Sequence, residues 1–209
     1  MKKYDTYRSL RGIHQGRNII VAGLGNSATK LLDAPPDTII IGVNDIGRLL
    51  TPDYNIVLNV KKSFNDDRWD YIENCRSKVI LTHIEDLREM PIKNTGSIVR
   101  IPLGSFGGFD IRLHDIRVDY TSNSPFVGIM VAHWLGARNV GLIGVDFTPN
   151  HFFGETGTHN LANRILRIDA EYERARMAFE NDGVGLYNLS DESRLTKLPK
   201  MSMTDFLAL

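Results

Sequence analysis

Short runs rich in isoleucine and valine recur along the chain, and they restrict the possible folds more than any other feature of the sequence. They occupy residues 18–22, 38–43, 55–60, 78–82, 97–101, 139–145 and 184–189. Because each run is apolar throughout rather than alternating between apolar and polar residues, it is typical of a parallel strand buried on both faces. The pattern therefore predicts a sheet whose two faces are both covered.

Helical patterns lie between some of these runs. Residues 124–135 are apolar on most sides, which indicates a buried helix that closes at Gly136. Apolar residues from 161 to 179 step by three or four positions, which predicts an amphipathic helix ending near Gly183. Strands that alternate with helices predict an α/β, Rossmann-like fold with a mostly parallel open sheet and helices on both faces.

The length of 209 residues fits a single domain. We expect one Rossmann-like nucleotide-binding domain over residues 1–209, with an N-terminal extension at 1–17 and a C-terminal tail at 190–209. The end of that tail, 201–209, can pack on the body or on a second subunit, so a homo-oligomer is left open. Residues 104–121 and 148–160 show little periodicity, and we expect loops there that flank the ligand site.

Composition excludes several classes of function. Lys plus Arg and Asp plus Glu both number 25, so the formal net charge is zero. This balance argues against nucleic acid as a partner, which requires a basic excess. A single cysteine, Cys75, indicates a reducing compartment. No apolar run approaches the roughly 20 residues of a membrane span, and no secretion signal is recognisable. We therefore expect a cytoplasmic protein.

A glycine turn follows the first predicted strand. Gly23 and Gly25 let the backbone approach a ligand, and Asn26 or Ser27 can cap the next helix and touch a ribose or phosphate. With Asp45, about 20 residues further on, the turn matches a relaxed dinucleotide fingerprint. Prolines at 35–36 make the crossover short for that unit, which disfavours a dehydrogenase. The alternative is a turn that serves only strand-to-helix geometry.

Polar residues also follow the second and third predicted strands. Asn44 and Asp45 come directly after residues 38–43, and Asn59 follows residues 55–58, the part of the third run that we expect to be the strand. Ligands of open α/β sheets bind outside the carboxyl ends of the strands, where these side chains would meet a nucleoside. The alternative is that each is an ordinary cap or turn residue.

The buried helix begins with small polar residues. Thr121, Ser122, Asn123 and Ser124 offer hydroxyl and amide groups at a helix start, where backbone N–H groups favour an anionic ligand. A plain N-cap is the alternative.

A carboxylate and two histidines follow the run at 139–145. Asp146 stands at its end, and His151 and His159 lie on the next loop. An imidazole can take a proton from a hydroxyl near neutral pH, with Asp146 orienting it. A metal site is an alternative, although the spacing matches no tight metal signature, and solvated loop histidines are another. Whether a metal binds is left open.

Two of these segments carry a family resemblance. The turn Gly-Leu-Gly-Asn-Ser, together with the stretch from Thr-Ser-Asn-Ser to Trp-Leu-Gly-Ala-Arg-Asn-Val-Gly-Leu-Ile-Gly-Val-Asp-Phe, resembles MptE-like proteins. That superfamily includes archaeal 6-hydroxymethylpterin diphosphokinases. The chain is also similar to bacterial sialyltransferases that use CMP-activated sialic acid. The resemblance covers residues 18–189 and implies a Rossmann-like sheet.

The resemblance to sialyltransferases implies roles for individual residues. Their glycine turn and an asparagine after the second strand hold the nucleotide, which implies such roles for Gly23, Gly25, Asn26 and Asn44. Their serine-rich helix start lies near the phosphate or donor sugar. The matching residues here are Thr121, Ser122 and Ser124.

The catalytic base and the acceptor are less closely specified by the resemblance. The family's catalytic histidine lies beyond the strand ending in Gly-x-Asp-Phe, so its counterpart is His151 or His159. The family turn commonly reads Gly-Pro-Ser, whereas Asn26 follows Gly25 here. The extra length that forms an acceptor lid in sialyltransferases is lacking, which leaves the acceptor open.

These observations predict a nucleotide-dependent transferase. The favoured hypothesis is a glycosyltransferase-like enzyme using a nucleotide-sugar donor and a small-molecule or glycan acceptor, related to surface glycans or phage. One alternative is a diphosphokinase of the MptE type that uses ATP with Mg²⁺, held by Asp45 or Asp146. Another is a non-catalytic nucleotide-binding protein.

Overall fold

The computed structural model describes residues 6–65, 67–93, 96–155 and 162–209. The strands in this part of the chain are β1 (Asn18–Ala22), β2 (Ile39–Val43), β3 (Tyr54–Ile56), β4 (Val79–Thr82), β5 (Ser97–Arg100), β6 (Leu103–Phe106), β7 (Val118–Tyr120), β8 (Asn139–Ile143), β9 (Asn150–His151), β10 (Gly154–Glu155) and β11 (Gly185–Asn188). The α-helices are α1 (Arg68–Glu73), α2 (Ser124–Trp134), α3 (Ile165–Asn181) and α4 (Met203–Leu207). Short 3-10 helices are η1 (Tyr7–Leu10), η2 (Asn26–Asp33), η3 (Ile46–Arg48), η4 (Lys61–Ser63), η5 (Leu87–Glu89) and η6 (Ala162–Arg164).

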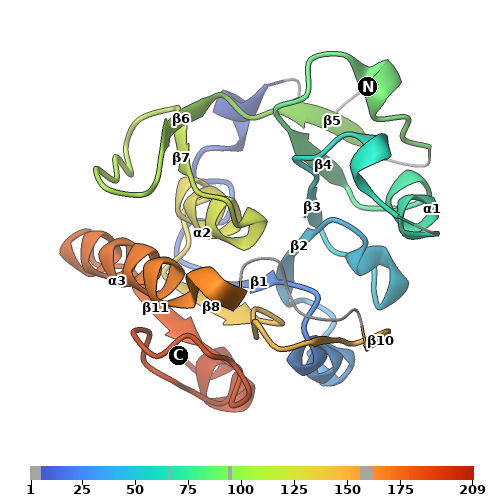
Figure 1. The fold of residues 1–209 in the computed structure, drawn as a ribbon. Coiled ribbons are helices and arrows are strands. Elements are labelled where there is room, and N and C mark those ends of the chain that lie inside the picture. Colours follow the sequence, from blue (N-terminus) through green and yellow to red (C-terminus); the bar gives the residue numbers. More distant parts are fainter. Residues whose placement is uncertain (1–5, 66, 94–95, 156–161) are drawn as a thin grey trace.

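Seven of the described strands form one sheet, in the order β11-β8-β1-β2-β3-β4-β5 (Figure 1). Every neighbouring pair in this sheet is parallel. The predicted α/β, Rossmann-like fold with a parallel open sheet is therefore confirmed. The predicted glycine turn follows β1, and the predicted histidine loop follows β8. These two strands are adjacent in the sheet.

The apolar runs are continuous because successive residues of each strand enter different cores. In β1, Ile19 and Val21 belong to the larger hydrophobic cluster, whereas Ile20 and Ala22 belong to a second cluster on the other side of the sheet. Side chains alternate between the two faces of a strand, so a sheet covered on both faces needs apolar residues at every position.

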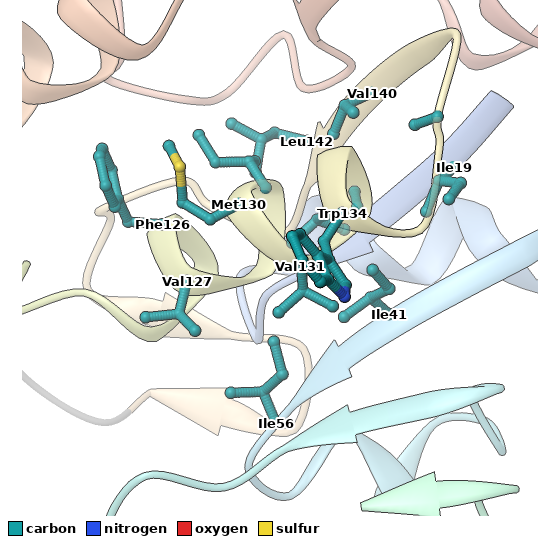
Figure 2. Packing of buried hydrophobic residues seen from close by; sticks show 14 of the residues in the cluster. Ile19, Ile41, Ile56, Phe126, Val127, Met130, Val131, Trp134, Val140 and Leu142 are labelled. Atoms are coloured by element: carbon teal, nitrogen blue, oxygen red, sulfur yellow. The ribbon is translucent and has the colours of Figure 1, made fainter. Parts of the chain in front are cut away.

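Helix α2 covers the middle of one face. Figure 2 shows Val127, Met130 and Val131 of α2 packed among side chains of the central strands, such as Ile41 and Leu142. Nearly every residue of α2 is buried, as its uniformly apolar sequence indicates. Helix α3 lies on the same face, with Ile168, Tyr172, Ala175 and Phe179 buried.

The two chain ends pack on the body of the domain. The Tyr7 ring of η1 stacks on Trp134 at a centroid distance of 5.3 Å, and the Trp134 indole N–H donates to the Tyr7 carbonyl at 2.9 Å. On the opposite face, Phe206 of α4 is fully buried in the second cluster. The C-terminal segment therefore covers the sheet of its own chain.

Several boundaries and loops differ from the sequence-based prediction. The runs predicted at 55–60 and 139–145 end as strands at Ile56 and Ile143. Residues 104–121, predicted as a loop, include most of β6 and all of β7, and the loop predicted at 148–160 includes β9 and β10. In the first case the buried Asp119 carboxylate accepts the backbone N–H groups of Ser105 and Arg112 at 2.8 and 2.9 Å. A segment held by one buried carboxylate needs no periodic apolar pattern, so the sequence does not indicate strands there.

Among the described residues, no helix has the length and apolar character needed to cross a membrane.

Gly128 provides a test of how closely α2 lies on the sheet. A Cβ added to Gly128 would lie 2.6 Å from Cγ1 of the buried Val21 in β1. Overpacking of this kind costs about 1–3 kcal/mol, whereas Gly→Ala in a helix gains at most about 1 kcal/mol. We expect Gly128→Ala to lower the free energy of unfolding, measured by urea denaturation. Met177→Ala, on the exposed side of α3, should change it by less than about 0.5 kcal/mol. A Gly128→Ala protein more stable than the parent would contradict this packing.

Candidate functional site

The strand order reverses between β1 and β8, so the connections after these two neighbouring strands lead to opposite sides of the sheet. From β1 the chain adds β2 to β5 on one side and then returns to add β8 and β11 on the other. Open α/β sheets bind ligands at such a switch point, outside the carboxyl ends of the strands. A cavity of about 200 Å³ lies there. The sequence-predicted residues that line it are Gly23, Gly25, Asn44, Asn59, Ser122, Asn123, Ser124, Asp146 and His151.

The glycine turn and the histidine loop meet at this cavity, although they are more than a hundred residues apart. Strands β9 and β10 form an antiparallel hairpin. The hairpin pairs back on the glycine turn, since Gly25 and His151 form an antiparallel bridge and the Phe152 N–H donates to the Leu24 carbonyl at 3.0 Å. His151 is thereby placed beside the first loop of the sheet.

The glycines of the turn are required by the protein's own backbone. A Cβ on Gly23 would overlap the Gly144 carbonyl, and a Cβ on Gly25 would overlap the Asp146 carboxylate. Gly144 itself has a φ of +69°, which favours glycine. The sequence analysis explained these glycines by the approach of a ligand. They are also required by the close contact between the loops after β1 and β8.

Asp146 holds this contact together. One carboxylate oxygen accepts the Ser27 backbone N–H at 2.9 Å, and the other accepts the hydroxyls of Ser27 and Ser190 at 2.7 Å each. The Ser27 hydroxyl in turn accepts the Gly144 N–H at 2.8 Å. The carboxylate is buried and anchors the glycine turn to the end of β8, which differs from the predicted role of orienting a histidine.

Two amide side chains in the cavity carry polar atoms that have no partner among the described residues. These atoms are Oδ1 of Asn44 and Nδ2 of Asn123, both buried. Buried polar atoms of proteins are nearly always hydrogen-bonded, so the Asn44 and Asn123 amides carry unused hydrogen-bonding capacity at the wall of the cavity.

Backbone strain also concentrates at the cavity. Asn44 and Phe147 are the described non-glycine residues with positive φ, at 50° and 55°. Left-handed backbone is costly for a bulky side chain such as phenylalanine, and such strain clusters at functional sites. Phe147 was not predicted to face the site, and neither were Thr148 and Asn150, which also line the cavity. The feature of the sequence that could have identified these three residues is their position shortly after β8.

The start of α2 forms a third wall of the cavity. Ser122, Asn123 and Ser124 lie there, and Asn123 is the N-cap but makes no side-chain capping hydrogen bond. The N-terminal N–H groups of a helix favour negative charge. Among the described residues that line the cavity there is no lysine or arginine, so the helix start and amide side chains, rather than side-chain cations, supply the positive electrostatic potential there.

Four predicted site residues do not line the cavity. Ser27 is buried beneath it, Thr121 is buried and accepts the Asn123 N–H, and Asn26 is exposed and donates to Glu192. The carboxylate of Asp45 is fully buried and accepts the Arg68 Nε–H at 3.0 Å, so it turns away from the space expected for a ribose. His159 lies outside the described residues.

The described residues contain no group of three or more His, Cys, Asp and Glu side chains arranged to hold a metal ion.

Comparison with solved structures finds a similar fold in a glycosyltransferase and in a sialyltransferase. The MAf glycosyltransferase from Magnetospirillum magneticum AMB-1 aligns with 97% of this chain at a TM-score of 0.57 and 14% identity. This chain spans only 39% of that protein's length. The sialyltransferase CstII from Campylobacter jejuni in complex with CMP aligns with 92% of this chain and 87% of its own, at a TM-score of 0.53 and 14% identity.

A second structure of the sialyltransferase, with CMP and a trisaccharide acceptor, aligns with 88% of this chain and 85% of its own, at a TM-score of 0.51 and 15% identity. The shared feature is a Rossmann-like fold. No protein-family model matches the sequence, and no curated protein matches it.

Ser27 provides a test of the contact between the two loops. Ser27→Ala removes a donor to Asp146 and an acceptor for the Gly144 N–H, both buried. Leaving buried groups unpaired costs about 1–3 kcal/mol, and we expect a loss of this size in the free energy of unfolding from denaturant titration. Thr29→Ala removes an exposed hydrogen bond to the Asn26 carbonyl on the same helix and should have little effect. Equal stability of the two variants would contradict the anchoring role.

Proposed function

We propose that this chain is a glycosyltransferase-like enzyme that transfers a sugar from a nucleotide-sugar donor to a hydroxyl group of a small-molecule or glycan acceptor. The observation that carries the proposal is the shared cavity, where amide side chains, the start of α2 and an imidazole face one space at the switch point. A nucleoside, a phosphate leaving group and an acceptor hydroxyl require these three kinds of group. The likeness in fold to a sialyltransferase bound to CMP supports it.

The electrostatics of the cavity favour a donor with one phosphate, such as a CMP-sugar. A nucleoside diphosphate leaving group carries more charge, which enzymes usually neutralise with lysine, arginine or metal ions. The described lining offers the start of α2 and the donor Nδ2 of Asn123 instead. In this arrangement Gly23, Gly25, Asn44 and Asn59 hold the nucleoside.

The proposed reaction is a displacement at the anomeric carbon of the donor sugar. His151 accepts the proton of the acceptor hydroxyl as its oxygen forms a bond to that carbon. The bond from the anomeric carbon to the phosphate oxygen breaks, and its electron pair leaves with the nucleotide. The negative charge that develops on the phosphate lies near the start of α2, where the helix dipole stabilises it.

The geometry favours glycosyl transfer over the diphosphokinase of the MptE type. That reaction uses Mg²⁺ with ATP, and Asp45 or Asp146 was the expected ligand. Both carboxylates are committed to protein groups: Asp45 to Arg68, and Asp146 to Ser27 and Ser190. A metal ion would have to displace these partners.

Nucleotide binding is the first test. At about one hundred times its Kd, a ligand stabilises a protein by about 2.7 kcal/mol, which for a domain of this size raises Tm by roughly 5–10 °C. We expect such a rise with CMP in a thermal melt and smaller rises with UDP and ADP. A rise with ATP that requires Mg²⁺ would support the diphosphokinase instead, and no rise with any of these nucleotides would remove the proposal.

Catalysis by His151 is the second test. We expect His151→Ala to lower kcat for CMP-sugar turnover by about 10²–10⁴-fold, the usual contribution of a general base. The thermal shift with CMP should persist, because the nucleoside is held by other residues. His83→Ala alters an exposed histidine after β4 and should keep full activity. CMP binding without any turnover in the parent protein would indicate a non-catalytic nucleotide-binding protein.

A further inference from the structure

We propose that Phe153, held by Arg48 and Asp45, is the positioning residue that sets the orientation of the His151 imidazole. The inference rests on the proposed function, in which His151 is the base. It assigns a role to three side chains that do not line the cavity, and it explains why Asp45 turns away from the ligand.

The ring of Phe153 contacts the imidazole directly. The two rings stack with a centroid distance of 5.2 Å and an angle of 20° between their planes. The guanidinium of Arg48 lies over the Phe153 ring, 4.4 Å from its centroid. Phe152 packs edge-on against Phe153 at 5.1 Å. Aromatic stacking and the cation–π contact both favour this arrangement of the Phe153 ring.

Arg48 is itself fixed from the opposite side. Its guanidinium also lies over the Tyr71 ring, 4.3 Å from the centroid. It forms ion pairs with Asp67 and with the buried Asp45, the latter at 3.4 Å from Nε to Oδ2. Only 15% of the Arg48 side chain is exposed. Arg68 provides the second partner of Asp45, so the carboxylate is neutralised by two cations.

The backbone alone does not orient the imidazole. Strands β9 and β10 have two residues each, and an isolated hairpin is marginally stable in water. Its bridge to Gly25 places the His151 main chain beside the glycine turn, but a main-chain bridge does not itself set the side-chain torsions. The stack on Phe153 restricts them.

Orientation matters because a base acts only within hydrogen-bond reach of the proton it removes. A displacement of about 1 Å at a reacting group can reduce the rate by about 10²-fold. The side-chain contacts from Asp45 to Arg48, from Arg48 to Phe153 and from Phe153 to His151 therefore connect the loop after β2 with the imidazole on the loop after β8.

The kinetic test uses Phe153→Leu, which keeps an apolar side chain of similar size but removes the ring. With CMP-N-acetylneuraminic acid as the donor probe, we expect kcat to fall by about 10–100-fold, while KM for the donor changes less than about twofold. Phe153→Tyr restores a ring and should restore kcat. Phe109→Leu removes an exposed phenylalanine elsewhere, on the loop between β6 and β7, and should behave as the parent protein.

The second readout does not depend on activity. The His151 ring protons, assigned by comparing NMR spectra of the parent protein and His151→Ala, should resonate upfield because of the Phe153 ring current and should move downfield in Phe153→Leu. If they do not move, the stack does not exist and the proposal is overturned. If they move but kcat is unchanged in Phe153→Leu while His151→Ala loses activity, the catalytic role of the stack is overturned. If His151→Ala retains full activity, or no donor is turned over, the proposed function fails, and the NMR result alone decides whether Phe153 orients His151.

Discussion

The candidate site depends on the close approach of the loops that follow β1 and β8. These strands are neighbours in space but far apart in the sequence, and the approach requires glycine at Gly23, Gly25 and Gly144. A buried carboxylate, Asp146 after β8, then joins the two loops by accepting hydrogen bonds from Ser27, and it also accepts one from Ser190, which follows β11. Without this contact the two sides of the switch point would not form one cavity.

The remaining parts of the site are attached to this contact. The hairpin after β8 returns to the glycine turn and carries His151 to the cavity. Helix α2, fixed by its packing across the sheet (Figure 2), places Ser122, Asn123 and Ser124 at its N-terminal end beside the same space. The cavity thus combines amide groups, a helix start and an imidazole, with no lysine or arginine among its described lining residues. This combination is the basis of the proposed glycosyl transfer from a monophosphate-linked donor.

Much of the sheet could be predicted from the sequence because a strand that is buried on both faces is apolar at nearly every position. The first strand was predicted at residues 18–22, and β1 has these bounds. Segments organised by a single polar group could not be predicted, as Asp119 and the strands β6 and β7 illustrate. The site followed the same division. Asn44 after β2, Asn59 beyond the end of β3 and Ser122 before α2 line the cavity, whereas Asp45, next to Asn44 in the sequence, does not.

The sequence by itself determined the fold class, the strands of the main sheet and the edge of that sheet at which polar residues collect, because strand periodicity and chain direction are local properties. Only the tertiary structure decided which of these residues face one another. Asn44 and Asp45 are neighbours in the chain, yet one lines the cavity and the other binds Arg68. Backbone dihedral angles and the positions of distant charged partners decide such outcomes, and neither can be read from residue order. The contact of Arg48 with Phe153, the ring on which His151 stacks, has the same origin, since Arg48 and Phe153 are far apart in the sequence.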